Sequence, residues 1–148
     1  MRTWTTETTV SGLPEEVLDL LTEPEAIRRW APIPFEVEEL DSHRLVAGAH
    51  ARVSGRLAGR TVSFDVEVFE VDDGRLALAA TGPISIDVEY VVTPVAEGAE
   101  VRASVTVEGR GLMGRVLAHA TDALLAAGAL NAAVGRIARE LEPQQVAA

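Results

Sequence analysis

The stretch VEGRGLMGRVL, residues 107–117, decides between two very different folds. Its glycines, Gly109, Gly111 and Gly114, have the spacing G-x-G-x-x-G, which is typical of a dinucleotide-binding loop between a strand and a helix. Such a site also needs a parallel strand after the helix and an acidic residue about 20 residues beyond the glycines. No strand pattern follows here. We therefore interpret the glycines as a sharp turn from a last, edge strand into a terminal helix.

Residues 35–108, upstream of these glycines, alternate between apolar and polar side chains, as strands with one covered and one wet face do. Short turns separate the runs, so we expect six strands with antiparallel neighbours. The turns are Asp41-Ser42-His43, Ala58-Gly59, Asp72-Asp73-Gly74, Gly82-Pro83 and Glu97-Gly98. The covered face carries Val62, Phe64, Val66 and Val68, then Ile84, Ile86, Val88, Tyr90 and Val92, then Val101, Ala103, Val105 and Val107.

Residues 112–141, downstream of the glycines, have a helical pattern that we expect to cover the dry face of the sheet. Alanines lie along the centre of its inward stripe, where larger side chains could fill space. They indicate either a close approach of the sheet or a void that serves as a binding cavity. The inward stripe is Met113, Val116, Leu117, Ala120, Ala123, Leu124, Ala127, Asn131, Val134, Ala138 and Leu141.

The N-terminal part predicts one more strand and two short helices. Residues 2–10 are rich in Thr, which favours a strand. Ser11 is a candidate cap for a helix that starts near Pro14, and Thr22 is a candidate cap for a second helix that runs to about Trp30. The sequence Ala-Pro-Ile-Pro at 31–34 ends that helix.

Residues 12–32, GLPEEVLDLLTEPEAIRRWAP, resemble the opening signature of the START-like (SRPBCC) superfamily: a Pro-Glu start, paired leucines, an acidic-Pro break and a Trp before Pro. The order of elements along the chain is also similar to this superfamily. The resemblance implies an α+β helix-grip fold, with a seven-stranded curved antiparallel sheet around a long C-terminal helix and two short helices after the first strand. It also implies a single START-like domain over residues 1–142, and we expect a flexible tail at 143–148.

The superfamily includes polyketide cyclases, lipid-transfer domains and pollen-allergen-like proteins, so the resemblance indicates fold more strongly than chemistry. Bacterial polyketide cyclase/dehydrase-like members are similar in general pattern. Proteins similar to an accessory component of carbon monoxide dehydrogenase share the glycine-rich stretch. In this fold the loop at 109–114 lies beside the pocket opening, which implies a second interpretation of the glycines as a mobile flap, and Trp30 lies at the entrance.

Composition narrows the classes of partner. The chain has 148 residues, no cysteine and a formal net charge of −10, which argues against nucleic acid, anionic membranes, disulfides and thiolate metal sites. No run of about 18 apolar residues predicts membrane insertion. We expect a soluble, cytoplasmic protein without a cofactor.

Few residues have the placement that catalysis needs. His43, His50 and His119 lack metal-ligand spacing, so we expect no metal. Most carboxylates alternate with apolar residues and should face water, whereas Glu7 lies in a strand of weak alternation and could enter the cavity as a base. Tyr90 is the other candidate for moving protons.

The sequence thus favours a protein that binds a hydrophobic small molecule, lipid or polyketide-like, between the sheet and the C-terminal helix. Tyr90 and Asn131 would orient the ligand. A polyketide cyclase or dehydratase that uses Tyr90 and Glu7 is one alternative, and a small assembly or maturation partner is another. The predicted lining is Trp30, Phe64, Val66, Tyr90, Met113, Leu117, Ala120, Leu124, Ala127 and Asn131. A possible homodimer would use the outward residues Ala118, Leu125, Ala129, Ala132 and Ala133.

Overall fold

A computed structural model describes residues 2–31, 35–57, 59–72 and 74–141. The predicted tail at 143–148 and most of the Ala-Pro-Ile-Pro break lie outside these residues. The elements, in chain order, are β1 (Arg2–Val10), α1 (Pro14–Thr22), α2 (Pro24–Trp30), β2 (Phe35–Leu40), β3 (His50–Leu57), β4 (Arg60–Asp72), β5 (Arg75–Thr81), β6 (Ile84–Val95), β7 (Gly98–Gly109), α3 (Gly111–Ala126) and α4 (Ala129–Glu140).

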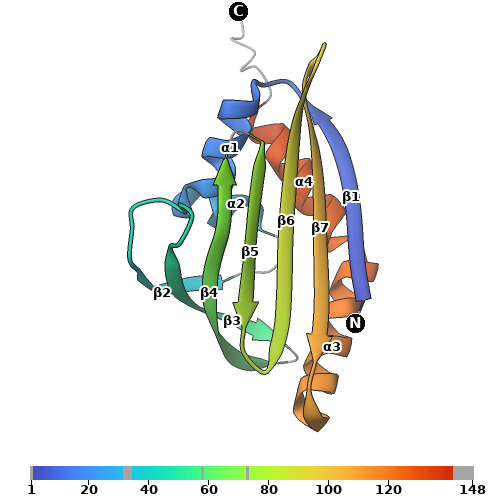
Figure 1. The fold of residues 1–148 in the computed structure, drawn as a ribbon. Helices are drawn as coiled ribbons and strands as arrows, with labels where there is room; N and C mark the ends of the chain where they lie inside the picture. The colour runs from blue at the N-terminus through green and yellow to red at the C-terminus, as the bar shows by residue number, and fades with distance from the viewer. Residues whose placement is uncertain (1, 32–34, 58, 73, 142–148) are drawn as a thin grey trace, which may run out of the picture.

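The strands form one seven-stranded antiparallel sheet in the order β1-β7-β6-β5-β4-β3-β2. The sheet curves around helices that lie on one of its faces (Figure 1). This confirms the predicted α+β helix-grip class and the antiparallel neighbours. The expectation that the last strand is an edge strand is wrong, because β1 pairs with β7 from Arg2 opposite Val107 to Val10 opposite Ala99.

The C-terminal helical region contains two helices rather than one. α3 ends at Ala126, Gly128 has the left-handed φ of 99°, and α4 starts at Ala129. The two helix axes differ by 52°. Glycine at this position ends a helix without the steric cost that a Cβ would bring. The bend lets α4 lie against β1 while α3 lies against β7 (Figure 1).

The three glycines of the G-x-G-x-x-G stretch allow a strand and a helix to touch. A Cβ on Gly109 would lie 2.2 Å from the carbonyl oxygen of Gly114, and a Cβ on Gly114 would lie 2.7 Å from the carbonyl oxygen of Pro83. Gly111 has a φ of 70°, which turns the chain from β7 into α3. The spacing therefore serves close packing and a turn.

The face that α3 and α4 bury differs from the predicted stripe. Met113 is 44%, Val116 53% and Leu124 43% exposed, and Ala123, Ala127 and Asn131 are exposed too. The predicted phase on α3 was wrong by about one residue, which rotates a helix face by about 100°. The break at Gly128 then resets the phase, so Leu125 and Ala133 of the expected dimer face are buried. The buried residues are Gly114, Leu117, Thr121 and Leu125 in α3 and Leu130, Ala133, Val134 and Ile137 in α4.

The short helices start where the prolines predict, but without the expected caps. Pro14 and Pro24 are the first residues of α1 and α2, and neither helix has a side-chain cap. Glu16 accepts a hydrogen bond from the backbone N–H of Leu13 at 3.3 Å. The Thr22 hydroxyl instead donates backward to the carbonyl of Leu18 at 2.7 Å. The proposed caps Ser11 and Thr22 are therefore incorrect.

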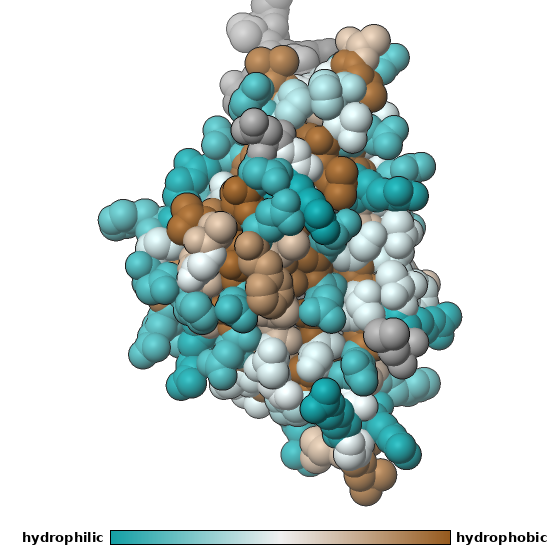
Figure 2. All heavy atoms as spheres, in the orientation of Figure 1, coloured by the Kyte–Doolittle hydropathy of each residue, from teal (hydrophilic) through white to brown (hydrophobic). Residues whose placement is uncertain are grey.

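The outer face of the sheet is the face seen in Figure 2. Hydrophilic side chains surround a central group of apolar ones on this face. A β-bulge between Val68 and Glu70 turns Phe69 outward, where it is 57% exposed, and keeps Val68 in the core. Among the described residues no single helix is long and apolar enough to cross a membrane, although the bent pair α3 and α4 together has that length and composition.

Candidate functional site

A cavity of about 220 Å³ lies on the inner face of the curved sheet. Its walls come from α1, α2, the strands β2 to β7 and the end of α3. All of the described wall residues except Trp30, Tyr90 and Thr121 have side chains without polar atoms. They are Leu21, Pro24, Ile27, Trp30, Ala31, Phe35, Val37, Leu40, Leu45, Ala51, Val53, Val66, Leu76, Leu78, Ile86, Val88, Tyr90, Val105, Thr121 and Leu125.

Partial burial of inward side chains marks where the cavity lies. Val66, Leu78 and Val88 point to the inner face in neighbouring strands, and each remains only half-buried. Val68 and Leu76 share that face and are 1% exposed, because other side chains cover them. The sheet is therefore closely packed along part of its inner face and open along the rest.

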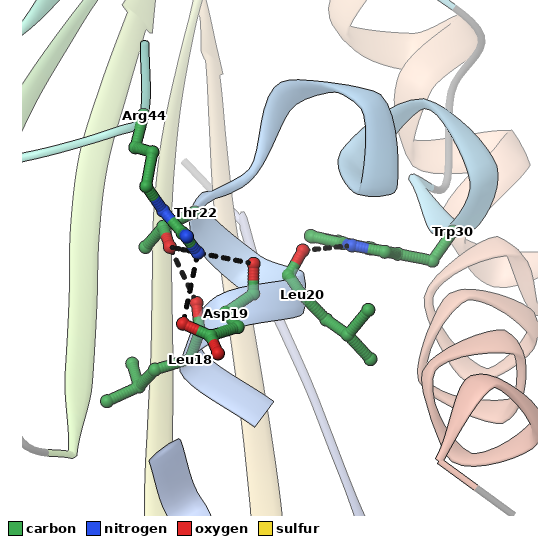
Figure 3. Close-up of polar contacts among 6 residues, drawn as sticks. All are labelled: Leu18, Asp19, Leu20, Thr22, Trp30 and Arg44. Carbon is green, nitrogen blue, oxygen red and sulfur yellow. Dashed lines mark hydrogen bonds and ion pairs between the residues drawn. The ribbon is translucent and has the colours of Figure 1, made fainter. Parts of the chain in front are cut away.

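Trp30 forms one wall and is held firmly in place. Its side chain is 4% exposed, and its Nε1–H donates to the carbonyl of Leu20 at 2.7 Å (Figure 3). The Arg136 guanidinium in α4 donates to the carbonyls of Trp30 and Ala31, at 3.3 and 2.9 Å. These carbonyls end α2 and have no partner within the helix, so Arg136 fixes this end of α2.

A second set of contacts fixes the loop that carries Leu45, another wall residue. Nη2 of Arg44 donates to Oδ1 of Asp19 at 3.0 Å and to Oγ1 of Thr22 at 3.2 Å (Figure 3). The backbone N–H of Leu45 donates to the carbonyl of Thr22 at 2.8 Å. The loop before β3 is thereby tied to the end of α1.

Tyr90 is the polar group that stands out in the cavity wall. Its side chain is 2% exposed, and its ring meets the Trp30 ring edge to face. No hydrogen bond joins the Tyr90 hydroxyl to any residue that the structure describes. Burial raises the pKa of this hydroxyl above its ordinary value of 10, so it keeps its proton at neutral pH.

The other two polar wall residues already have partners. The Thr121 hydroxyl donates to the carbonyl of Leu117 at 2.9 Å, and the Trp30 N–H is bound to Leu20. A ligand in the cavity therefore meets apolar surface and one hydroxyl that can both donate and accept.

The comparisons with known proteins agree with this geometry. Residues 1–142 match the family described as polyketide cyclase / dehydrase and lipid transport. The chain belongs to this family. A search of curated proteins finds no match.

Solved structures show the same fold. Protein CV1439 from Chromobacterium violaceum is 18% identical with a TM-score of 0.71, over 97% of this chain and 99% of that one. Ara h 8.0201 is 16% identical with a TM-score of 0.59, over 92% and 97%. DynU16, a putative protein in the dynemicin biosynthetic locus, is 25% identical with a TM-score of 0.63, over 95% of this chain and 47% of that one. The chain thus spans about half of DynU16.

The structure brings three of the predicted lining residues to the cavity, Trp30, Val66 and Tyr90. Phe64 and Leu117 are buried in the core beside it, at 7% and 2% exposure. The remaining predicted residues do not lie in its wall, because the helix phase differs. They are Met113, Ala120, Leu124, Ala127 and Asn131.

Asn131 has a different partner from the one expected. It is exposed on α4, and its side-chain oxygen accepts a hydrogen bond from the Thr6 hydroxyl in β1. Glu7 is also misplaced in the cyclase hypothesis. It pairs in register with Arg102 and is exposed on the outer face of the sheet, so it does not enter the cavity.

The sequence interpretation missed the wall formed by β2, β3 and the short helices, and Thr121 and Leu125 in α3. One signal could have identified the α3 residues. Gly114 in the centre of the helix-strand contact fixes the phase, and Thr121 and Leu125 follow it at seven and eleven residues. Among residues 2–31, 35–57, 59–72 and 74–141, no three His, Asp or Glu side chains are placed to hold a metal ion.

Proposed function

We propose that this protein binds a hydrophobic small molecule, lipid or polyketide-like, in the cavity between the sheet, the short helices and α3. The observation that carries this proposal is an apolar cavity of about 220 Å³ with one unpaired hydroxyl, that of Tyr90. An apolar cavity of about 150 Å³ is enough for benzene in an engineered protein, so this one has room for a larger molecule. The family description, which names polyketides and lipid transport, supports this class of ligand.

Apolar burial supplies the affinity, and Tyr90 supplies orientation. Placing apolar ligand surface against these walls is worth about 25 cal/mol for each Å² removed from water. The Tyr90 hydroxyl selects ligands that have an oxygen at the matching place, because an unpaired buried polar group costs free energy.

The wall chemistry favours binding over acid–base catalysis. The described lining has no carboxylate and no histidine, and Glu7 lies on the outer face. Tyr90, with its raised pKa, is a weak acid and is not ionised to act as a base near neutral pH. A cyclase would then depend on shaping its substrate alone.

Native mass spectrometry of the purified protein tests the proposal. We expect a retained or added small apolar molecule to shift the mass of the folded protein and to be lost on denaturation. A panel of fatty alcohols and bicyclic aromatic compounds, none of which binds at millimolar concentration, would contradict the proposal.

A further inference from the structure

A second hollow adjoins the cavity at its α2 and β2 side. This groove, of about 620 Å³, lies between α2, β2, β3 and β4, and Phe35 lines both the groove and the cavity. On α2, Ile27 lines the cavity and the next residue, Arg28, lines the groove. A molecule that fills the cavity and passes Phe35 would therefore enter the groove.

The groove differs from the cavity in chemistry. Its charged residues are Arg28, Arg56 and Glu36, so its formal charge is +1, from two arginines and one glutamate. The whole chain has a net charge of −10, which makes a positive groove unusual on this molecule. The hydroxyls of Ser54 and Thr61 add hydrogen-bond donors beside the arginines.

Neither groove arginine is neutralised within the described part of the chain. Arg29, Arg44 and Arg52 each pair with a carboxylate, at 2.9 to 3.2 Å. No such pair involves Arg28 or Arg56 among the described residues. Nη2 of Arg56 donates to the carbonyl of Gly59 at 3.2 Å, a contact that holds the side chain at the groove and leaves its other N–H groups free.

We propose that the ligand is an amphipathic acid, whose apolar body lies in the cavity and whose carboxylate lies in the groove between Arg28 and Arg56. This inference rests on the proposed function and specifies its ligand class. Guanidinium groups bind carboxylates through paired N–H donors. Glu36 opposes this binding, and its effect gives the test a second direction.

The test compares decanoic acid with 1-decanol, which have the same chain length, by isothermal titration calorimetry of the full chain. We expect Arg28→Gln and Arg56→Gln each to weaken decanoate binding by about three- to fivefold, the range for exposed charge contacts. Glu36→Gln should strengthen it, and decanol binding should stay unchanged in all three variants. Raising the salt concentration should weaken decanoate alone.

Arg102→Gln is the matched control, because Arg102 is exposed on the outer face of β7, away from the groove. It should leave both affinities unchanged. Equal binding of decanoate and decanol, with no selective loss in the arginine variants, would overturn the inference and leave the proposed function in place. Failure of the wild-type protein to bind either molecule would overturn the proposed function and this inference with it.

Discussion

The ring of Trp30 meets the ring of Tyr90 edge to face, with 5.4 Å between centroids and 74° between planes. The two residues come from α2 and β6, far apart in the sequence, and both line the cavity. The Trp30 N–H is bound to Leu20, whereas the Tyr90 hydroxyl has no partner among the described residues. The pair thus joins a fixed wall to a free polar group.

Tyr90→Phe should separate these two roles. The ring contact stays and only the hydroxyl is lost, so we expect little change in the free energy of unfolding. Binding of 2-naphthol should weaken by about three- to tenfold, the usual worth of one hydrogen bond. Binding of naphthalene, which has no hydroxyl, should stay the same. Calorimetry with both ligands checks this, and an equal loss for both would contradict the role of the hydroxyl.

The alkaline titration of the protein should report on Tyr90 alone. The chain has one tyrosine and no lysine, and burial raises the pKa of the Tyr90 hydroxyl above 10. Above pH 10 the unfolded chain loses this proton and the folded protein keeps it, so stability should fall as pH rises, by up to about 1.4 kcal/mol per pH unit. Urea unfolding between pH 8 and pH 11 measures the decline.

The Tyr90→Phe variant is the control for that measurement, because it removes the only titrating tyrosine. Its stability should fall less steeply above pH 10 than that of the wild-type protein. Parallel curves for the two proteins would show that Tyr90 ionises freely in the folded state.

Gly114→Ala should destabilise the fold. Its new Cβ would lie 2.7 Å from the carbonyl oxygen of Pro83, so α3 must move away from β7. We expect a loss of about 1–3 kcal/mol, as for other overpacked sites. Gly135→Ala in α4 is the control, since a Cβ there meets only the end of the Arg139 side chain, at 4.0 Å. It should stabilise the protein by up to about 1 kcal/mol through helix propensity. Thermal and urea unfolding distinguish the two.

Arg136→Met should loosen the end of α2. The change removes the donors to the carbonyls of Trp30 and Ala31, and we expect a loss of about 1–2 kcal/mol in the free energy of unfolding. Arg139→Met, three residues later on the same helix, is exposed and should change stability by less than about 0.5 kcal/mol. Similar losses in the two variants would show that Arg136 does not support α2.

The strands could be predicted from the sequence because their periodicity is two and the pattern repeats over many residues. The inward positions of Phe64, Val88 and Tyr90 follow directly from it. Trp30 could be placed at the cavity only through the family resemblance, since a single aromatic residue at a helix end has no periodic signal. The seven strands and the two short helices are confirmed.

The faces of α3 and α4 could not be predicted in the same way. Alanines surround the whole circumference of both helices, so a rotation of about 100° changes the apolar pattern little. The contact of Gly109 with Gly114 and the break at Gly128 decide the phase, and both depend on tertiary packing. For this reason Met113, Leu124 and Asn131 were assigned to the cavity, whereas Thr121 and Leu125 line it.

The most direct test of the account is to fill the cavity. Val88 lies half-buried in the cavity wall, and Val116 is 53% exposed on the surface of α3. Titration with the neutral fluorescent probe N-phenyl-1-naphthylamine should give at least about tenfold weaker binding to Val88→Phe, while Val116→Phe binds like the wild-type protein and both variants stay folded. Unchanged binding to a folded Val88→Phe variant would contradict the claim that the cavity holds the ligand.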